Sequence, residues 1–202
     1  MNTAPSAEIR DAEAERRQMG FFPRLIPPEV CARWVAGVRE NDGFYVPVYR
    51  GSDGRHNVVD KSQRNVKSVP TVYPEEIQAW VRKIVVEVIS PFYKAKITRW
   101  EPPQLLRYEP GGFYSAHFDS EVYIEGKLTK IADRDYSLIV FLNTDFTGGG
   151  LDFPEQDLQI LPEVPGGGIV FPSGHRYPHG VHPVEQGLRY SLVTWMAVDG
   201  PA

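Results

Sequence analysis

The pattern of hydrophobic and polar positions changes its period near residue 93. Before that point, two stretches repeat apolar residues every three or four positions, as amphipathic helices do. The first helix is predicted over 27–43, and the second over 75–90, where Pro91 is expected to stop it. A short strand is predicted before them, over 21–26. The apolar stripes of the two helices are Val30, Trp34 and Val38, and Ile77, Trp80, Val81, Ile84, Val85 and Val88.

After residue 93 the apolar residues fall in short runs separated by Gly, Pro, Asn or Asp, as in strands joined by turns. The runs are KAKITRW, QLLRY, FYSAHF, YSLIVFLN, GLDF, LQIL, GGIVF, HGVHPV and LRYSLVTWMA. Because no helical period separates them, they indicate a β-sandwich or jelly roll. We therefore predict a single domain over 1–202 that is mainly β with N-terminal helices. In it, a helix-rich part, 1–92, packs on a β core formed by 93–198.

The candidate chemistry begins in the run FYSAHFD. His117 and Asp119 are two positions apart in a predicted strand, so their side chains project from the same face. Phe118 is expected to point the other way, behind the sheet. An imidazole and a carboxylate side by side provide half of a metal site. The sequence must supply the other half elsewhere.

The second imidazole is sought in the stretch SGHRYPHGVHPV, which holds three of the five histidines. His179 and His182 face opposite sides of a strand, so at most one of them is expected to join His117. Spacing alone does not choose between them. His56 and His175 are interpreted as surface or packing residues.

Two imidazoles and one carboxylate would bind one face of an octahedral ion and leave three positions open. That set is typical of non-haem Fe(II) oxygenases and differs from closed structural zinc sites. An open iron needs a chelating co-substrate whose far end is held. Arg189 is the candidate anchor, because it shares a strand face with Val193 and Trp195, where a buried arginine needs an anion.

Composition narrows the remaining classes. A net charge of −4 argues against binding duplex nucleic acid by broad electrostatics. The single cysteine, Cys31, excludes an internal disulfide framework and a cysteine-rich zinc site. No apolar run is as long as a membrane span, and no signal-peptide core begins the chain. The expectation is a cytoplasmic protein without nucleic-acid or membrane partners, whose oligomeric state the sequence does not indicate.

Taken together, HFD, the later PHGVHPV and an arginine ten residues beyond His179 resemble the Fe(II)/2-oxoglutarate-dependent dioxygenases. The resemblance is strongest to the prolyl 4-hydroxylase-like branch and extends over roughly 21–198. It implies a double-stranded β-helix, that is, a jelly roll, with the two helices packed on one sheet. It also implies Fe(II), the co-substrates 2-oxoglutarate and O₂, and ascorbate.

The resemblance assigns the iron ligands as His117, Asp119 and His179, because the family's basic anchor follows its last ligand by about ten residues. By that offset His182 is not a ligand.

The same resemblance assigns the co-substrate residues. Arg189 holds the far carboxylate of 2-oxoglutarate, Tyr108 donates a hydrogen bond to the same molecule, and Trp195 lines the metal pocket.

The implied reaction is hydroxylation of an unactivated C–H bond, with release of succinate and CO₂. Asp119 favours hydroxylation over halogenation, since halogenating relatives have a small residue at that place. The expected substrate is a prolyl residue in a peptide or protein, and a free amino acid or small natural product is the alternative. From other classes, a silent jelly-roll binding protein and a zinc hydrolase stay open.

Three polar stretches complete the sequence. Residues 1–18 alternate in charge and are interpreted as a frayed or weakly helical leader, and 51–67 as a loop or irregular strand pair. The most charged connection, 120–135, is either a lid beside the site or a solvated hairpin loop. We predict that 120–135 and 57–67 recognise the substrate.

Overall fold

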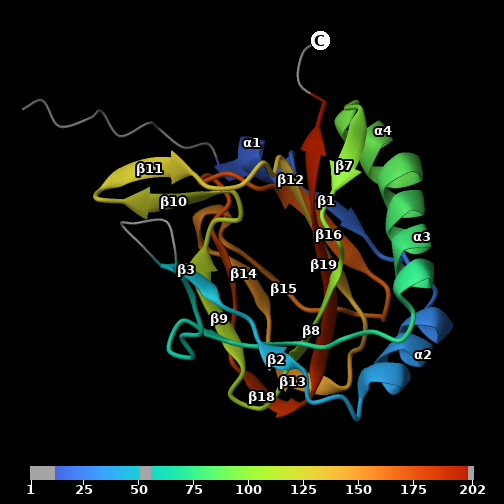
Figure 1. Cartoon of the computed structure of the whole chain (residues 1–202). Helices are drawn as coiled ribbons and strands as arrows, with labels where there is room; N and C mark the ends of the chain where they lie inside the picture. The colour runs from blue at the N-terminus through green and yellow to red at the C-terminus, as the bar shows by residue number, and fades with distance from the viewer. Residues whose placement is uncertain (1–11, 51–55, 200–202) are drawn as a thin grey trace, which may run out of the picture.

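The structure is a computed structural model that describes residues 12–50 and 56–199. Two β-sheets face each other, and helices cover the outer side of the larger one (Figure 1). The larger sheet has the order β1-β16-β12-β19-β8-β6-β2, with β7 paired to β19. Its strands are β1 (Gly20–Phe22), β2 (Phe44–Tyr45), β6 (Lys67–Ser68), β7 (Ile97–Trp100), β8 (Gln104–Tyr108), β12 (Tyr136–Phe141), β16 (Gly168–Pro172) and β19 (Arg189–Val198).

The smaller sheet, of order β15-β14-β17-β9-β5, closes the other side of the barrel. Its strands are β5 (Arg64–Asn65), β9 (Phe113–His117), β14 (Leu151–Phe153), β15 (Leu158–Ile160) and β17 (His179–Val181). Three two-stranded ribbons extend from the sheets. They are β3 (Val48–Arg50) with β4 (His56–Val58), β10 (Glu121–Ile124) with β11 (Lys127–Lys130), and β13 (Phe146–Gly148) with β18 (Val184–Gly187). This architecture confirms the predicted jelly roll.

Alternation along the central strands separates two apolar cores. On β12, Leu138 and Val140 belong to the core shared with the helices, whereas Ile139 and Phe141 face the space between the sheets. β19 follows the same rule: Val193 faces inward with Ile139, and the Arg189 guanidinium lies over the ring of Phe141 in the same core. The inner face of the larger sheet therefore carries the predicted anchor.

The helices pack on the outer face of the larger sheet, as predicted. They are α2 (Pro28–Val38), α3 (Pro74–Ile84), the π-helix η1 (Val85–Ile89) and α4 (Ser90–Tyr93). The prediction that Pro91 stops the second helix is wrong, because the chain stays helical to Tyr93. The π turn already replaces the usual bonding there, since Ser90 N bonds to Val85 O five residues back, and a proline then interrupts less. The helix ends at Lys94, whose φ is 51°.

The part before residue 93 contains more ordered structure than the sequence indicated. Besides the helices, its described residues include the six short strands β1 to β6, of which β5 completes the smaller sheet. The predicted leader is partly ordered as α1 (Ala12–Arg16), and its remaining residues, 1–11, lie outside the described residues. Glu15 of α1 is only 3% exposed and accepts a hydrogen bond from Gln156, which lies in the short 3₁₀-helix η2 (Pro154–Gln156). This tertiary contact, which the sequence does not reveal, holds α1 on the barrel.

No helix among residues 12–50 and 56–199 is long and apolar enough to cross a membrane.

Candidate metal centre

The two sheet strands β9 and β17 bring the predicted ligands together. His117 and His179 are directly opposite each other in the antiparallel β9–β17 pair, with ring centroids 4.4 Å apart. Asp119 follows β9 by two residues, and its two carboxylate oxygens lie 3.5 Å from His117 Nε2 and 3.4 Å from His179 Nε2. One ligand atom from each residue lies within 4.8 Å of the others. The cluster therefore has the compactness of a metal site.

Hydrogen bonds set the tautomer of both imidazoles. His117 Nδ1 is 3.0 Å from Ser115 O, and His179 Nδ1 is 3.1 Å from Tyr177 O. A carbonyl oxygen only accepts, so each Nδ1 carries the hydrogen and donates it. The Nε2 lone pairs of both rings then point towards Asp119, as metal ligation requires.

Asp119 is 7% exposed and is fixed from three sides. Ser137 Oγ donates to its Oδ2 at 2.6 Å, and Ser137 Oγ is 2.7 Å from Ser173 Oγ. The backbone of Asp119 also donates to Ser173 O and accepts from Arg134 Nη1 at 2.9 Å. These contacts orient the carboxylate before any ligand arrives.

Electrostatics keep the cluster in a ligand-binding protonation state. Burial alone would raise the pKa of Asp119, but His179, His117 and the Ser137 hydroxyl outweigh it and hold that pKa well below its ordinary value. Burial lowers the pKa of His179 to about 4. At neutral pH the carboxylate is therefore charged and the His179 imidazole is neutral.

Arg189, the predicted anchor, is a buried cation without a counter-ion among the described residues. Only 1% of the residue is exposed, and no carboxylate of the described residues pairs with it. Its Nη1 donates to Ser191 Oγ, whereas Nε and Nη2 have no hydrogen-bond partner. Burial lowers the pKa of Arg189, because charge is costly in this environment. Two free donors on a buried fork are suited to a carboxylate.

The other two residues predicted for the co-substrate pocket also lie on the inner side of the larger sheet. Tyr108 is opposite Arg189 in the β8–β19 pair, and the guanidinium carbon lies 4.7 Å from the Tyr108 ring centroid. Tyr108 and Trp195 line the same pocket as the metal cluster. The space open to a water molecule among these side chains is about 30 Å³. Gly149, at φ 62°, leaves room for the stem of Arg189, since a Cβ there would lie 3.0 Å from its Cδ.

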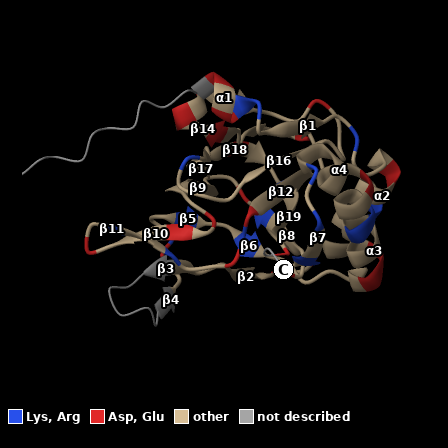
Figure 2. Cartoon of the chain, turned by 90° about the horizontal axis from the view of Figure 1, so that it is seen from above, with Lys and Arg blue, Asp and Glu red and all other residues tan. Residues whose placement is uncertain are grey.

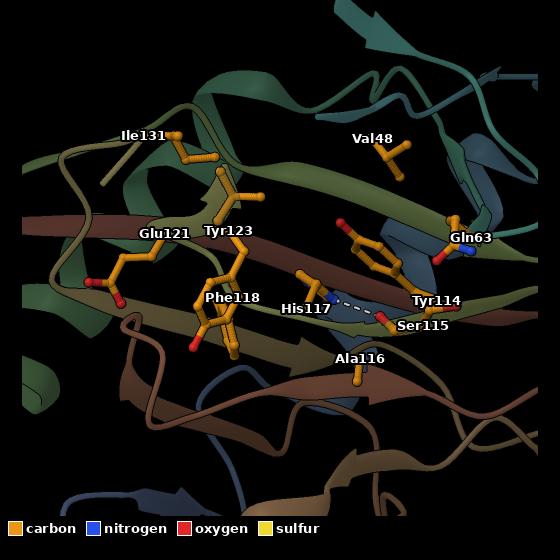
Figure 3. A pocket seen from close by; sticks show the side chains of 11 residues that line it. Val48, Gln63, Tyr114, Ser115, Ala116, His117, Phe118, Glu121, Tyr123 and Ile131 are labelled. Carbon is orange, nitrogen blue, oxygen red and sulfur yellow. Dashed lines mark hydrogen bonds between the residues drawn. The ribbon is translucent and has the colours of Figure 1, made fainter. Parts of the chain in front are cut away.

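A groove of about 490 Å³ opens beside His117 (Figure 3). Apolar side chains dominate its walls, and the β10–β11 hairpin forms one side. The connection over 120–135 is thus a hairpin, and its Tyr123 lines the groove. Phe118 does not pack behind the sheet as expected: β9 ends at His117, and Phe118 lies in the groove wall. The lining consists of Val48, Gln63, Tyr114, Ser115, Ala116, His117, Phe118, Glu121, Val122, Tyr123 and Ile131.

A β-bulge brings Tyr114 to the same site. His117 pairs with His179, and Tyr114 pairs with Val181, so three steps on β9 match two on β17. The extra residue changes the alternation, and the Tyr114 and His117 rings stack with centroids 3.6 Å apart. Sequence alternation alone would have placed them on opposite faces.

The remaining histidines lie elsewhere. His182 is half exposed, with Nε2 3.7 Å from Asp152 Oδ1 and not in the cluster. His175 donates to Glu121 at the base of the β10–β11 hairpin. The side chain of His56 is outside the described residues. Sequence reasoning singled out none of five further residues of the site, although Arg64 and Arg134 lie in the two stretches predicted to recognise the substrate: Arg64, Tyr114, Arg134, Ser137 and Ser173.

The donor set fits a divalent iron. It offers two imidazole nitrogens and one carboxylate, and the cluster opens towards a groove instead of being closed by a fourth protein ligand among the described residues. The unpaired donors of Arg189 in addition fit an acidic co-substrate. Both parts of the predicted cofactor set are thus matched by the residues present.

Comparison with known proteins agrees with this geometry. Residues 103–197 match the model of the 2OG-Fe(II) oxygenase superfamily. Prolyl 3-hydroxylase 1 of Gallus gallus is 39% identical over 71 residues, which cover 33% of this chain and 10% of that protein. This chain thus matches only a small part of that curated relative.

Two solved structures share the fold. The viral collagen prolyl hydroxylase of Paramecium Bursaria Chlorella virus-1, in complex with 2OG, aligns with a TM-score of 0.66 at 19% identity and covers 89% of this chain and 95% of its own. The Trichoplax adhaerens prolyl hydroxylase, in complex with a hypoxia inducible factor peptide, gives a TM-score of 0.66 at 16% identity over 92% and 86%. Over residues 103–197, the double-stranded β-helix of this chain is therefore similar to the 2OG-Fe(II) oxygenase superfamily.

Proposed function

We propose that the chain is an Fe(II)- and 2-oxoglutarate-dependent dioxygenase that hydroxylates a prolyl residue in a peptide or protein and releases succinate and CO₂. In this proposal His117, Asp119 and His179 are the iron ligands. The proposal also includes ascorbate, which the family resemblance implies, and a cytoplasmic location, which rests on the sequence alone.

One observation carries the proposal: the compact His–Asp–His cluster and the unpaired Arg189 line the interior of one barrel. A carbohydrate- or peptide-binding jelly roll has no need of a buried guanidinium with two unused donors. A zinc hydrolase would need a metal with a free coordination position, but it would not need a buried residue that holds the carboxylate of a co-substrate. The combination fits an enzyme that chelates an oxo acid at a metal and holds its far carboxylate.

The chain's own residues would prepare the reaction. Both imidazoles present Nε2, and Asp119 is held by Ser137, so the ligands need no reorganisation. Arg189 would pair with the far carboxylate and Tyr108 would donate to the same molecule. Bound Fe(II), with O₂ and 2-oxoglutarate, would supply the oxidising power to break a C–H bond. A peptide that fills the apolar groove would keep water from the reacting centre.

The groove supports a substrate larger than a single amino acid. Its volume is about 490 Å³, and it lies directly outside His117 between the β10–β11 hairpin and Val48. The similarity to prolyl hydroxylases in sequence and in fold points to a prolyl residue. The sequence resemblance is to 4-hydroxylases and the curated relative is a 3-hydroxylase, so an assay must resolve both products.

The test is incubation of the chain with Fe(II), 2-oxoglutarate, ascorbate and a library of prolyl peptides. Succinate is measured together with a peptide mass increase of one oxygen, and amino-acid analysis separates 3- from 4-hydroxyproline. Free L-proline is assayed in parallel as the small-molecule alternative. We expect succinate and hydroxylated peptide in equal amounts, and neither with Asp119→Ala. If the chain instead hydrolyses a substrate with Zn(II) in place of Fe(II) and without O₂, it is a hydrolase and the proposal is wrong.

A further inference from the structure

A second arginine in the site has no use in the function proposed above. Arg64 lies on β5, directly opposite Tyr114 of β9, and it lines the inner pocket together with His117 and Asp119. Its guanidinium carbon lies 4.4 Å from the Tyr114 ring centroid, and that ring stacks on His117. The neighbouring residue, Gln63, lines the outer groove. Arg64 thus stands where the groove meets the metal pocket (Figure 3 shows Gln63, Tyr114 and His117).

Arg64 is buried yet incompletely bonded. The residue is 8% exposed, Nη1 donates to Pro47 O at 3.2 Å, and Nε is buried without a partner. Within the part of the chain that the structure describes, no carboxylate pairs with it. The third buried arginine, Arg107, differs, because it pairs with Glu109 and donates to three backbone carbonyls. Only Arg64 and Arg189 therefore combine burial with a missing counter-ion among the described arginines.

Charge balance separates the roles of the two arginines. A ferrous ion, the Asp119 carboxylate, dianionic 2-oxoglutarate and Arg189 sum to zero. Arg64 then adds one uncompensated positive charge beside the reacting centre. A neutral peptide carbonyl would satisfy its donors but leave that charge, whereas a carboxylate satisfies both.

We propose that Arg64 is a second anion-recognition residue and binds a carboxylate of the primary substrate close to the residue that is hydroxylated. The inference rests on the proposed function, since it takes Arg189 as the residue occupied by 2-oxoglutarate. The substrate class it names is an acidic one: a prolyl peptide with an Asp or Glu beside the proline, or one whose own terminal carboxylate adjoins it. If Arg64 instead only supports the Tyr114 ring, its replacement changes stability and not ligand preference.

The experiment observes the arginine Nε–H groups of the full chain by ¹⁵N NMR, with diamagnetic Zn(II) in the metal site. Arg64 and Arg189 are assigned by the signals lost in Arg64→Lys and Arg189→Lys. Addition of 2-oxoglutarate should shift the Arg189 signal. Acetate, added next at constant ionic strength, should shift the Arg64 signal in a saturable way in the millimolar range, and uncharged acetamide should not.

The two arms distinguish the two possible failures. If 2-oxoglutarate does not shift the Arg189 signal, the proposed function fails. If that signal responds but acetate leaves Arg64 unmoved, the function stands and the inference about Arg64 is overturned. The acetate titration decides the case even when no test peptide binds.

Matched peptides then identify the source of the carboxylate. Acetyl-Ala-Pro-Glu-amide is compared with acetyl-Ala-Pro-Gln-amide for a side chain, and acetyl-Ala-Pro with its amide for a chain terminus. In at least one of the two pairs, the peptide that carries the carboxylate should bind roughly ten- to a hundredfold more tightly than its neutral partner. Arg64→Gln should abolish that ratio while keeping the Arg189 response. Arg99→Gln, at an exposed arginine paired with Asp133, is the control and should keep the ratio. A ratio that survives Arg64→Gln contradicts the proposal.

Discussion

Replacing Arg189 with leucine is the sharpest test of the co-substrate site. The variant keeps an apolar side chain against Tyr108 and Phe141 but removes the guanidinium fork. In the unliganded protein, two of its nitrogens, Nε and Nη2, lack partners, so their removal breaks no hydrogen bond of those two atoms. The variant also loses the bond from Nη1 to Ser191 Oγ, but the main loss falls on ligand binding.

The magnitude follows from those two donors. A charge-assisted pair contributes about 1.5–3 kcal/mol, so Arg189→Leu should weaken 2-oxoglutarate roughly ten- to a hundredfold. Ligand stabilisation should fall in step: at a concentration 100 times the original Kd, it is about 2.7 kcal/mol, and a hundredfold weaker Kd leaves about 0.4 kcal/mol. Without ligand, Arg189→Leu should be at least as stable as the parent, because a buried, unpaired charge is costly. Arg189→Lys should lie between, since it keeps the charge and loses the fork.

Two assays check this prediction. The first is the apparent KM for 2-oxoglutarate at saturating Fe(II), and the second is thermal unfolding with and without 2-oxoglutarate. Iron affinity should change little, because Arg189 contacts none of the three ligands of the cluster.

Arg107→Leu is the matched control. Arg107 lies on the same strand pair but on the opposite face, where it bonds to carbonyl groups after α2. The Arg107→Leu variant should have a lower melting temperature and an unchanged KM for 2-oxoglutarate. An unchanged KM in Arg189→Leu would refute the anchor assignment and remove the main local support for an acidic co-substrate.

Three further predictions concern the metal centre and the groove. His117→Ala, Asp119→Ala and His179→Ala should each abolish turnover, as an activity assay shows, whereas His182→Ala should still bind iron. Equilibrium dialysis with Fe(II) under argon measures the binding. If His182→Ala loses the iron and His179→Ala keeps it, the wrong histidine was assigned. Ser137→Ala should weaken metal binding roughly ten- to a hundredfold by freeing the Asp119 carboxylate, and Ser137→Thr should restore part of it; equal affinities in dialysis would contradict a positioning role. Shortening the β10–β11 hairpin should impair peptide hydroxylation but leave slow 2-oxoglutarate decarboxylation; unchanged peptide turnover would remove the hairpin from the substrate site.

Sequence alone determined the features that depend on residues close to one another along the chain. Strand alternation predicted that Arg189 and Val193 share a face, and in the structure both face the interior. The two-residue spacing of His117 and Asp119 kept their side chains adjacent even though β9 ends at the histidine. Helical periodicity located α2 and α3, since such patterns report which face is buried without knowledge of the partner.

Only the tertiary structure decided which distant residues meet. The choice between His179 and His182 depends on the pairing of β17 with β9, and spacing left it open before the family offset was used. The bulge in β9 that brings Tyr114 to His117 has no signature in the alternation of polar and apolar residues. Ser137 reaches Asp119 from β12, 18 positions away, and nothing in the sequence distinguishes this serine from one whose hydroxyl bonds to water.

Arg64 shows the same limit most clearly. In the sequence it lies in the polar stretch 51–67, which is interpreted as a loop or irregular strand pair. In the structure the same residue is on a strand of the smaller sheet, buried against Tyr114. The burial of Arg64 and its lack of a counter-ion among the described residues are properties of the assembled site, because both depend on which residues of other elements pack around the guanidinium. Sequence patterns report the face of an element, and the packing of several elements decides what that face meets.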